Sequence, residues 1–201
     1  MATKVEICNL ASTHLGVGHS ICNFDTDQSE EGQAYRAVYD IALRVVLREH
    51  PLTFTTKIAT LALIEEDPNT EWQYSYRYPV DCITIRRILS GTRADTRQSR
   101  LPYKIGADSQ GIVIWTDQEN AEMEYTYYAD NPNHYPSDFV LAFSYYLAHI
   151  VSKRISVGDQ FKLGDRAYQM YLIEISRAAA AGFNESQSEE EIESEFIRAR
   201  S

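Results

Sequence analysis

The sequence predicts an α+β protein that is mainly α: a helical bundle with a small antiparallel β insertion and an extended C-terminal tail. Apolar residues recur at helical spacing near both ends of the chain, whereas apolar and polar residues alternate in its middle. The last stretch is rich in glutamate and holds only isolated apolar residues. We therefore expect a single domain over residues 1–184, with the β insertion at about 72–129, followed by a tail over 185–201.

Two helices are expected before the insertion, at about residues 3–15 and 27–50. Apolar side chains follow three- and four-residue spacing in both segments. Gly16 follows the first helix, at a position where glycine commonly ends one. At the start of the second helix, Asp27 and Glu30 form a variant of the capping box, in which side-chain oxygens accept hydrogen bonds from free backbone amides.

The middle of the chain indicates strands. Between residues 72 and 78 every second residue is aromatic, so in an extended chain these side chains share one face. The isoleucines at 83–88 predict another strand, and residues 111–115 and 122–129 predict a further pair joined by a turn. A small antiparallel β region is the natural expectation.

Two more helices are expected after the insertion, at about residues 137–156 and 165–181. Ser137 is expected to cap the first of them, and Gly182 to end the second. The tail that follows mixes glutamates with apolar residues and finishes with two arginines. Such a composition is typical of a segment that becomes ordered when it docks on a partner.

The charge of the chain argues against broad binding of nucleic acid. The formal net charge is −10, and the six glutamates and two arginines of residues 185–201 account for −4 of it. The remaining residues are also net negative and offer no attractive field for phosphates. No apolar run is long enough to span a bilayer, and Glu6, Asn9 and His14 interrupt any signal core. We therefore expect a soluble protein made in the cytoplasm.

No residue pattern points to catalysis, a cofactor or a metal. The histidines form no helical pair at metal-ligand spacing, and the three cysteines contain no CxxC pair. Motifs for nucleophiles, phosphate-binding loops and zinc hydrolases are missing. Glu65, Glu66 and Asp67 form an acidic cluster, but Pro68 follows them and a solvated turn explains the cluster.

Tyrosine is unusually frequent, with 14 copies in 201 residues. The aromatic strand either covers a core, since aromatic residues favour strands, or forms a protein interface, where tyrosine and tryptophan supply large contact area. The tail is a second candidate surface. The candidate partner-binding residues are Trp72, Tyr74, Tyr76, Tyr78, Phe183, Ile192, Phe196, Ile197, Arg198 and Arg200.

Four stretches carry a resemblance to a known family. They are the first helix with its end at Ala11-Ser-Thr-His-Leu15-Gly16, the second helix running into Arg48-Glu-His-Pro-Leu-Thr-Phe54, the segment Trp72-Gln-Tyr-Ser-Tyr-Arg-Tyr-Pro-Val-Asp-Cys82-Ile, and the Pro136–Arg154 helix followed by one ending Arg177-Ala-Ala-Ala-Ala-Gly. In these stretches the chain resembles the head-to-tail adaptor proteins of short-tailed phages, also called tail tubular protein A or head-completion proteins.

The resemblance implies a structural subunit of the virion neck. Some relatives have been ascribed cell-wall hydrolase activity, but this sequence has no identifiable pair of carboxylates for it, and we expect no enzymatic activity. Members of the family form a ring, typically of twelve copies, between the portal protein and the tail nozzle protein, and DNA only passes through the channel. Their C-terminal segments reach along the portal, which implies a docking role for residues 182–201. Two alternatives stay open: a glycan or peptidoglycan hydrolase associated with the phage tail, and a scaffold or regulator that binds some other protein.

Overall fold

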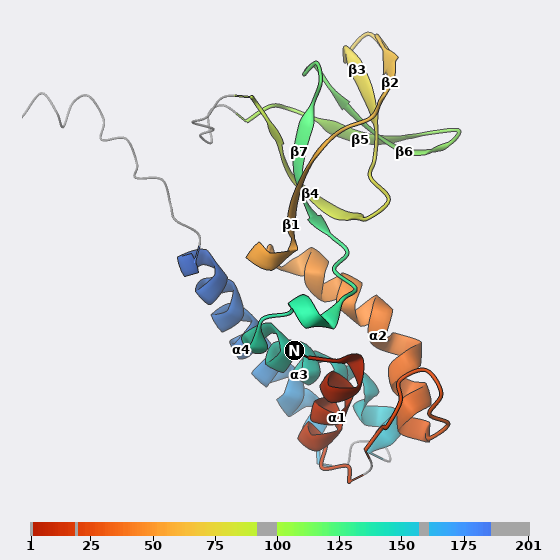
Figure 1. Cartoon of the computed structure of the whole chain (residues 1–201), viewed down its shortest axis with the longest axis vertical. Coiled ribbons are helices and arrows are strands. Elements are labelled where there is room, and N and C mark those ends of the chain that lie inside the picture. Colours follow the sequence, from red (N-terminus) through yellow and green to blue (C-terminus); the bar gives the residue numbers. More distant parts are fainter. Residues whose placement is uncertain (1, 19, 92–99, 157–160, 186–201) are drawn as a thin grey trace, which may run out of the picture.

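The structure is a computed structural model that describes residues 2–18, 20–91, 100–156 and 161–185. The chain forms two lobes, which lie one above the other in Figure 1. We call the part built from the four α-helices the helical lobe. We call residues 56–127, which contain all the described strands, the β-lobe.

The helical lobe is formed by both ends of the described chain. Its α-helices are α1 (Lys4–His14), α2 (Glu30–Glu49), α3 (Ser137–Ile155) and α4 (Leu163–Glu185). The short 3-10 helices η1 (Thr53–Thr55) and η3 (Pro132–His134) lie where the chain passes between the lobes. Helix α3 is the centre of the lobe, because α1, α2 and α4 all pack against it.

The composition of α3 explains this central position. Its buried residues combine large rings with alanines and serines, so neighbouring helices approach it closely on several sides. Phe139 and Phe143 stack on one another with ring centroids 5.8 Å apart, and Phe143 also meets Tyr39 of α2 edge to face. The core of the helical lobe is therefore organised around the aromatic side of α3.

The β-lobe consists of two antiparallel sheets. The first has three strands in the order β1-β7-β4, and the second has four in the order β2-β3-β6-β5. The strands are β1 (Thr56–Thr60), β2 (Leu63–Glu66), β3 (Tyr74–Arg77), β4 (Cys82–Leu89), β5 (Lys104–Asp108), β6 (Gly111–Thr116) and β7 (Glu122–Tyr127). Side chains from both sheets form a second core, which contains Leu61, Tyr76, Ile88, Ile114, Ala121, Met123 and Tyr125.

The predicted fold class, a mainly helical bundle with a small β insertion, is wrong. The fold is mixed: the β part holds two sheets and begins at Thr56, well before residue 72. All four residues of β2 are exposed and β1 is only partly buried, so neither strand produces the alternation that marks a half-buried strand. Strands β6 and β7, which were expected to pair, lie in different sheets.

Three predicted helix ends also need correction. Helix α2 begins at Glu30 with Ser29 as its cap, because the Ser29 hydroxyl accepts a hydrogen bond from the backbone of Gly32. Helix α3 is preceded by Pro136 and has no side-chain cap, so Ser137 does not fill that role. Gly182 lies inside α4, where the Thr53 hydroxyl would be 2.6 Å from an added Cβ. This glycine allows close contact with η1 and does not end the helix.

Two β-bulges in β4 aim side chains toward the helical lobe. Each bulge leaves one residue of β4 without a partner on β7, Ile83 in the first and Arg86 in the second. Ile83 packs against the core of the helical lobe. The irregular strand thus supplies one apolar and one charged contact at the boundary between the lobes.

Arg86 joins the three-stranded sheet to the segment that follows α2. Its Nη1 donates to the Thr56 hydroxyl at 2.7 Å, and its Nε donates to the Thr126 hydroxyl at 3.1 Å. Its Nη2 donates to the Leu52 carbonyl at 2.7 Å and to the Thr55 hydroxyl at 3.3 Å. Burial lowers the pKa of this guanidinium. Charged hydrogen bonds of this kind fix the relative position of the groups they join.

Removing the hydroxyl group is expected to have different effects on the free energy of unfolding at two buried tyrosines of α2. The Tyr35 hydroxyl lies 3.0 Å from the Ser12 hydroxyl of α1, whereas the Tyr39 hydroxyl is buried without a hydrogen-bond partner among the described residues. We expect Tyr35→Phe to lower the free energy of unfolding by about 1 kcal/mol and Tyr39→Phe to leave it unchanged or raise it. Urea denaturation of the two single variants measures this difference. An equal loss of unfolding free energy in the two variants would contradict this expectation.

Protonation of His14 is expected to lower the stability of the protein under mildly acidic conditions. Its Nε2 lies 3.0 Å from the Ser144 hydroxyl, its ring stacks on Tyr145 at 3.8 Å, and burial lowers its pKa. A histidine whose pKa is lowered in the folded state resists protonation there. The stability that its neutral form contributes is therefore complete above about pH 6.5, the ordinary pKa of histidine in an unfolded chain, and is lost as the pH falls below that value.

We expect His14→Gln to reduce the change in thermal midpoint between pH 7.5 and 5.5. The effect corresponds to less than about 1 kcal/mol, because the ring is only half-buried. His134→Gln, at an exposed position, is the matched control. An unchanged pH dependence in His14→Gln would show that other groups carry it.

Candidate protein-interaction surfaces

The aromatic side chains around β3 are mostly committed to the β-lobe core. Tyr76 is 1% exposed, and its hydroxyl donates to the Gln118 carbonyl at 2.8 Å. Tyr74 and Tyr78 are partly buried and pack against the same core. These three side chains share a face, as the sequence predicted, and that face is turned toward the three-stranded sheet, which supplies Ile88, Met123 and Tyr125 to the core. Tyr76 therefore has no surface to offer a partner.

Trp72 lies just before β3 and does not join this core cluster. Its indole Nε1 is buried and has no hydrogen-bond partner among the described residues. The ring lines a shallow hollow of about 320 Å³ with Asp67, Glu71 and Asp117. Trp72 therefore differs from Tyr74, Tyr76 and Tyr78, which pack in the β-lobe core.

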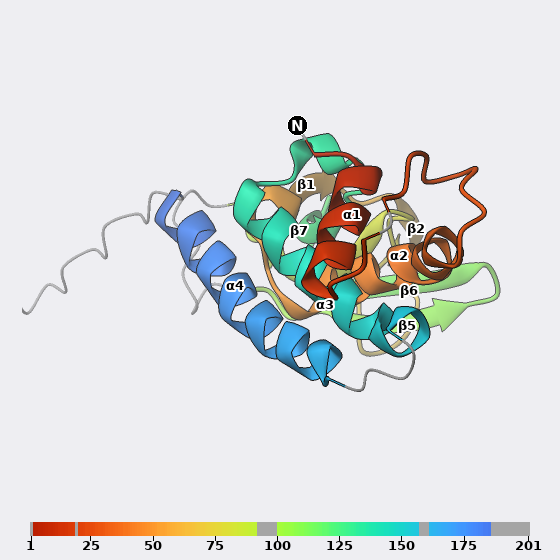
Figure 2. The same cartoon turned by 90° about the horizontal axis from the view of Figure 1, so that it is seen from below.

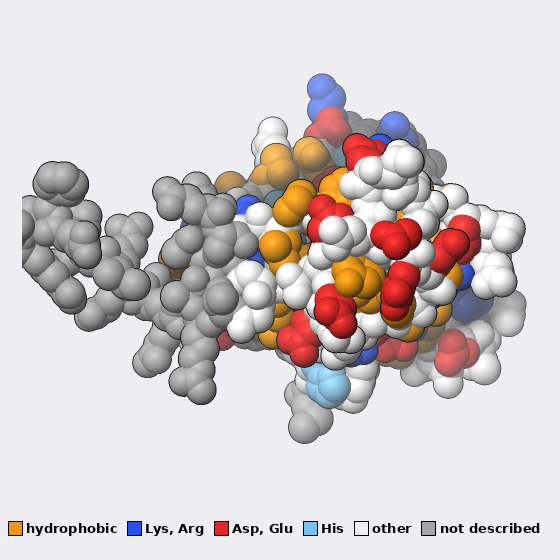
Figure 3. All heavy atoms as spheres, turned by 90° about the horizontal axis from the view of Figure 1, so that it is seen from above, with side chains coloured by type: hydrophobic (Ala, Val, Ile, Leu, Met, Phe, Trp, Pro, Cys, Tyr) orange, Lys and Arg blue, Asp and Glu red, His pale blue; other side chains and the backbone are white. Residues whose placement is uncertain are grey.

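The distal face of the β-lobe is acidic and apolar. Figure 3 shows it from above, with acidic side chains distributed among hydrophobic ones. Partial desolvation and the nearby carboxylates of Glu119 and Glu66 raise the pKa of Tyr74, which places these charges around one ring. The exposed acidic residues of the β2–β3 hairpin and of the turn after β6 are Glu65, Glu66, Asp67, Glu71, Asp117 and Glu119.

The acidic cluster expected to form a turn lies partly in a strand. Glu65 and Glu66 are the last residues of β2, and only Asp67, with a φ of 51°, turns the chain toward β3. Because Glu65 and Glu66 are adjacent in a strand, their side chains point to opposite faces of the sheet. This arrangement does not bring the two carboxyl groups together as acid–base hydrolysis requires.

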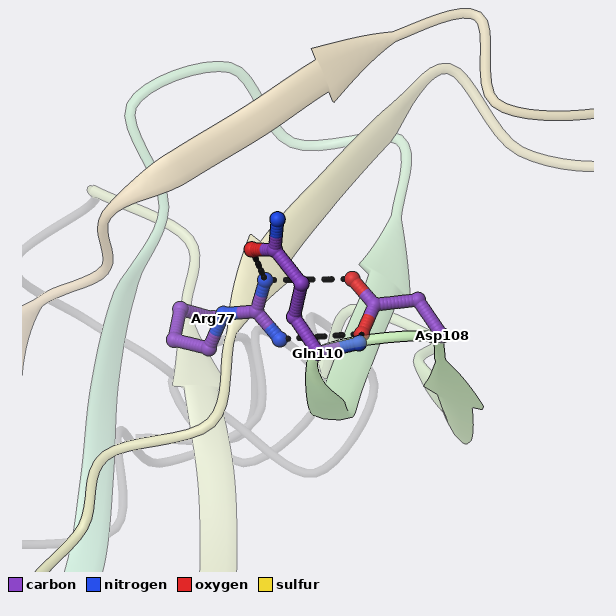
Figure 4. Close-up of polar contacts among 3 residues, drawn as sticks. All are labelled: Arg77, Asp108 and Gln110. Carbon is purple, nitrogen blue, oxygen red and sulfur yellow. Dashed lines mark hydrogen bonds and ion pairs between the residues drawn. The ribbon is translucent and has the colours of Figure 1, made fainter.

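The tip of the β5–β6 hairpin contains a polar cluster that stabilises the sheet. Arg77 of β3 makes two parallel hydrogen bonds of 3.1 Å to the Asp108 carboxylate and a third, of 3.2 Å, to the Gln110 side chain (Figure 4). The Arg77 guanidinium lowers the pKa of Asp108. Each member has its partner within the β-lobe, so the cluster serves the fold.

Among the predicted tail and helix-end candidates, Phe183 is the only described one. It lies near the end of α4 and is 68% exposed. Ile192, Phe196, Ile197, Arg198 and Arg200 lie outside the described residues. The structure thus separates Phe183, on the helical lobe, from the aromatic residues of the β-lobe.

An apolar surface on α4 was missed by sequence reasoning. Helix α4 packs against α3 through Ala167, Tyr171 and Ile175, yet apolar side chains also cover its opposite side. We call Leu172, Ile173 and Phe183, each at least 45% exposed, the α4 outer face. The ring of Tyr168 is not part of it, because its centroid lies 4.8 Å from that of His149 on α3. The signal in the sequence is that apolar residues occupy more of the helix circumference than one buried stripe needs.

A second apolar surface lies between α2 and β4. This α2/β4 groove has a volume of about 320 Å³ and is lined by Ile41, Arg44, Val45, Arg48, Cys82 and Ile83. Ile41 is 68% exposed, although it belongs to a helix whose other apolar residues are largely buried. The groove therefore combines apolar side chains with two cations.

Arg44 and Arg48, the two cations of the α2/β4 groove, differ in their contacts with the rest of the protein. The Arg44 guanidinium lies over the Tyr128 ring, 3.9 Å from its centroid. Arg48 is exposed and forms no ion pair with a described residue. An anionic group that enters the groove would meet Arg48 without displacing an existing partner.

The two apolar surfaces face away from each other. Helices α2 and α4 flank α3, and in Figures 1 and 2 they lie on opposite sides of the helical lobe. The α4 outer face is turned away from α3, and the α2/β4 groove opens on the side of α2 that does not contact α3. One subunit thus presents two different apolar surfaces in roughly opposite directions.

The described residues contain no group of three or more histidine, cysteine or acidic side chains that could hold a metal ion. None of the described helices is long and apolar enough to cross a membrane. A scan against models of protein families found no match, and a search of curated proteins found no significant relative.

Proposed function

We propose that this chain is a structural head-to-tail connector subunit of a short-tailed phage, forming a ring, of about twelve copies as in the family it resembles, between the portal protein and the tail nozzle protein. The observation that carries the proposal is the pair of different apolar surfaces on opposite sides of the helical lobe, the α4 outer face and the α2/β4 groove. A monomer that exposes both leaves apolar area in water, which association would bury.

Two different surfaces on one subunit allow a ring or, when the rotation does not close, an open filament, and the proposal commits to the ring. When one surface of a subunit binds a different surface of its neighbour, the contact is heterologous, and each added copy repeats the same rotation. The assembly closes if this rotation divides a full turn. Two identical surfaces would instead produce a closed dimer, so the presence of two unlike surfaces favours a ring over such a dimer.

The charge of the chain suits a channel through which DNA moves. With a net charge of −10, the chain offers no strong attraction for phosphates, and DNA can pass without being held. The proposal gives the tail over residues 185–201, which combines Phe196 and Ile197 with Arg198 and Arg200 near its end, the role of docking on the portal. It needs no cofactor and no membrane.

Electron microscopy of the purified chain, alone and mixed with the portal protein of the same phage, tests the proposal. We expect the chain to form rings on the portal, and reconstructed virions to show it between portal and tail nozzle. Leu172→Asp with Ile173→Asp on the α4 outer face should abolish ring formation, while Leu63→Asp on the β-lobe, at a comparably exposed position, should not. Location elsewhere in the virion, or absence from it, would refute the proposal.

A further inference from the structure

The tail follows helix α4, which lies on the opposite side of the helical lobe from α2, the helix that lines the α2/β4 groove (Figures 1 and 2). Helix α4, whose last residue is Glu185, packs on one side of α3, and α2 packs on another. Residues 186–192 can span up to about 25 Å when extended. In a ring of copies that all face the same way, the side of one subunit that carries α4 meets the side of the next that carries the groove.

The chemistry of the groove matches the first part of the tail. The groove is lined by the apolar side chains of Ile41, Val45 and Ile83 and by two arginines. The tail sequence from Ser186 to Glu195 holds five glutamates around a single apolar residue, Ile192. An acidic segment with one apolar anchor is the complement of an apolar groove with two cations.

We propose that residues 186–195 of one copy occupy the α2/β4 groove of the next copy, with Ile192 against its apolar side chains and the glutamates beside Arg44 and Arg48. This inference rests on the proposed ring, and it names the contact that links neighbouring subunits. It leaves residues 196–201 to extend toward the portal. The first part of the tail therefore links neighbouring subunits, and its last part contacts the portal.

Disulfide trapping in the full-length chain tests the inference. Ile41→Cys and Ile192→Cys are introduced together with Cys22→Ser and Cys82→Ser, which remove the exposed native thiol and the native thiol that lines the groove. Under mild oxidation we expect covalent dimers and higher oligomers on non-reducing gels, with the 41–192 disulfide identified by peptide mass mapping. Adding Arg44→Glu and Arg48→Glu should lower the yield by about tenfold, because two attractive charge pairs become repulsive.

The matched control replaces Ile41→Cys with Leu63→Cys, at a similarly exposed position on the β-lobe that lies outside the groove. Equal cross-linking in the control overturns the inference, and so does a monomer with an internal 41–192 disulfide, since that places the tail in its own groove. If rings form on the portal but residues 41 and 192 do not cross-link between copies, only the inference fails. If no ring forms, the proposed function fails as well.

Discussion

Replacing Arg86 with alanine is expected to lower the free energy of unfolding by about 3 kcal/mol, because several charged hydrogen bonds are lost and their acceptors are left partly buried. The acceptors belong to β1, β7 and the Leu52–Thr55 segment, so one side chain connects the sheet to the chain that leaves α2. The substitution should lower the stability of the protein and should also loosen the orientation of the β-lobe relative to the helical lobe.

Urea denaturation measures the first effect, and hydrogen exchange of the backbone amides of Thr55 and Thr56 measures the second. Arg77→Ala is the matched control, because Arg77 also makes three hydrogen bonds in the β-lobe but contacts only exposed or partly exposed side chains. We expect a clearly smaller effect for the control. Equal destabilisation by the two substitutions would show that position at the lobe boundary adds nothing.

Gly106→Val is expected to destabilise the β-lobe by about 1–3 kcal/mol through overpacking. Gly106 lies on the edge strand β5, opposite Val113 of β6, and the six-membered ring of Trp115 packs directly over its Cα. A Cβ at this position overlaps that ring, which must then leave the surface of the sheet. An aromatic side chain that covers an edge glycine in this way stabilises the strand pair.

The comparison with Ala107→Val separates packing from strand propensity. Valine favours strands over both glycine and alanine, so propensity alone predicts that both substitutions stabilise the sheet. Ala107 is exposed on the same strand, and Ala107→Val should be neutral or stabilising. Thermal unfolding followed by tryptophan fluorescence reports on both stability and the position of Trp115. A stabilised Gly106→Val protein would show that the ring moves without cost.

The sequence predicted the helices better than the sheets, for a physical reason. Helical spacing is local, so the segments of α1, α2 and α3 are found within a few residues of the expected ranges. Strand pairing is not local. Strand β7 pairs with β1 and β4, and nothing in the turn after Thr116 indicates that β6 belongs to another sheet. The exposed strand β2 produced no alternating pattern at all.

The candidate surfaces were predicted only in part. Alternation correctly grouped Tyr74, Tyr76 and Tyr78 on one face, but whether that face meets a core or a partner depends on the three-stranded sheet that packs against it. The α2/β4 groove could not be predicted, because it needs Ile83, which a β-bulge turns toward the helical lobe. Bulges depend on the register of two strands and leave little trace in one of them.

The pairing of Thr56 with Thr126 brings together the two points where the chain passes between the lobes. The β-lobe is therefore an insertion between α2 and α3, and its two ends lie side by side at the boundary between the lobes. Its distal hairpins can lengthen, shorten or change sequence without altering the path of the helices. A lineage that keeps the helical lobe, Ile83 and Arg86 constant could thus adapt the protein to different neighbours by changing only the distal hairpins of the β-lobe.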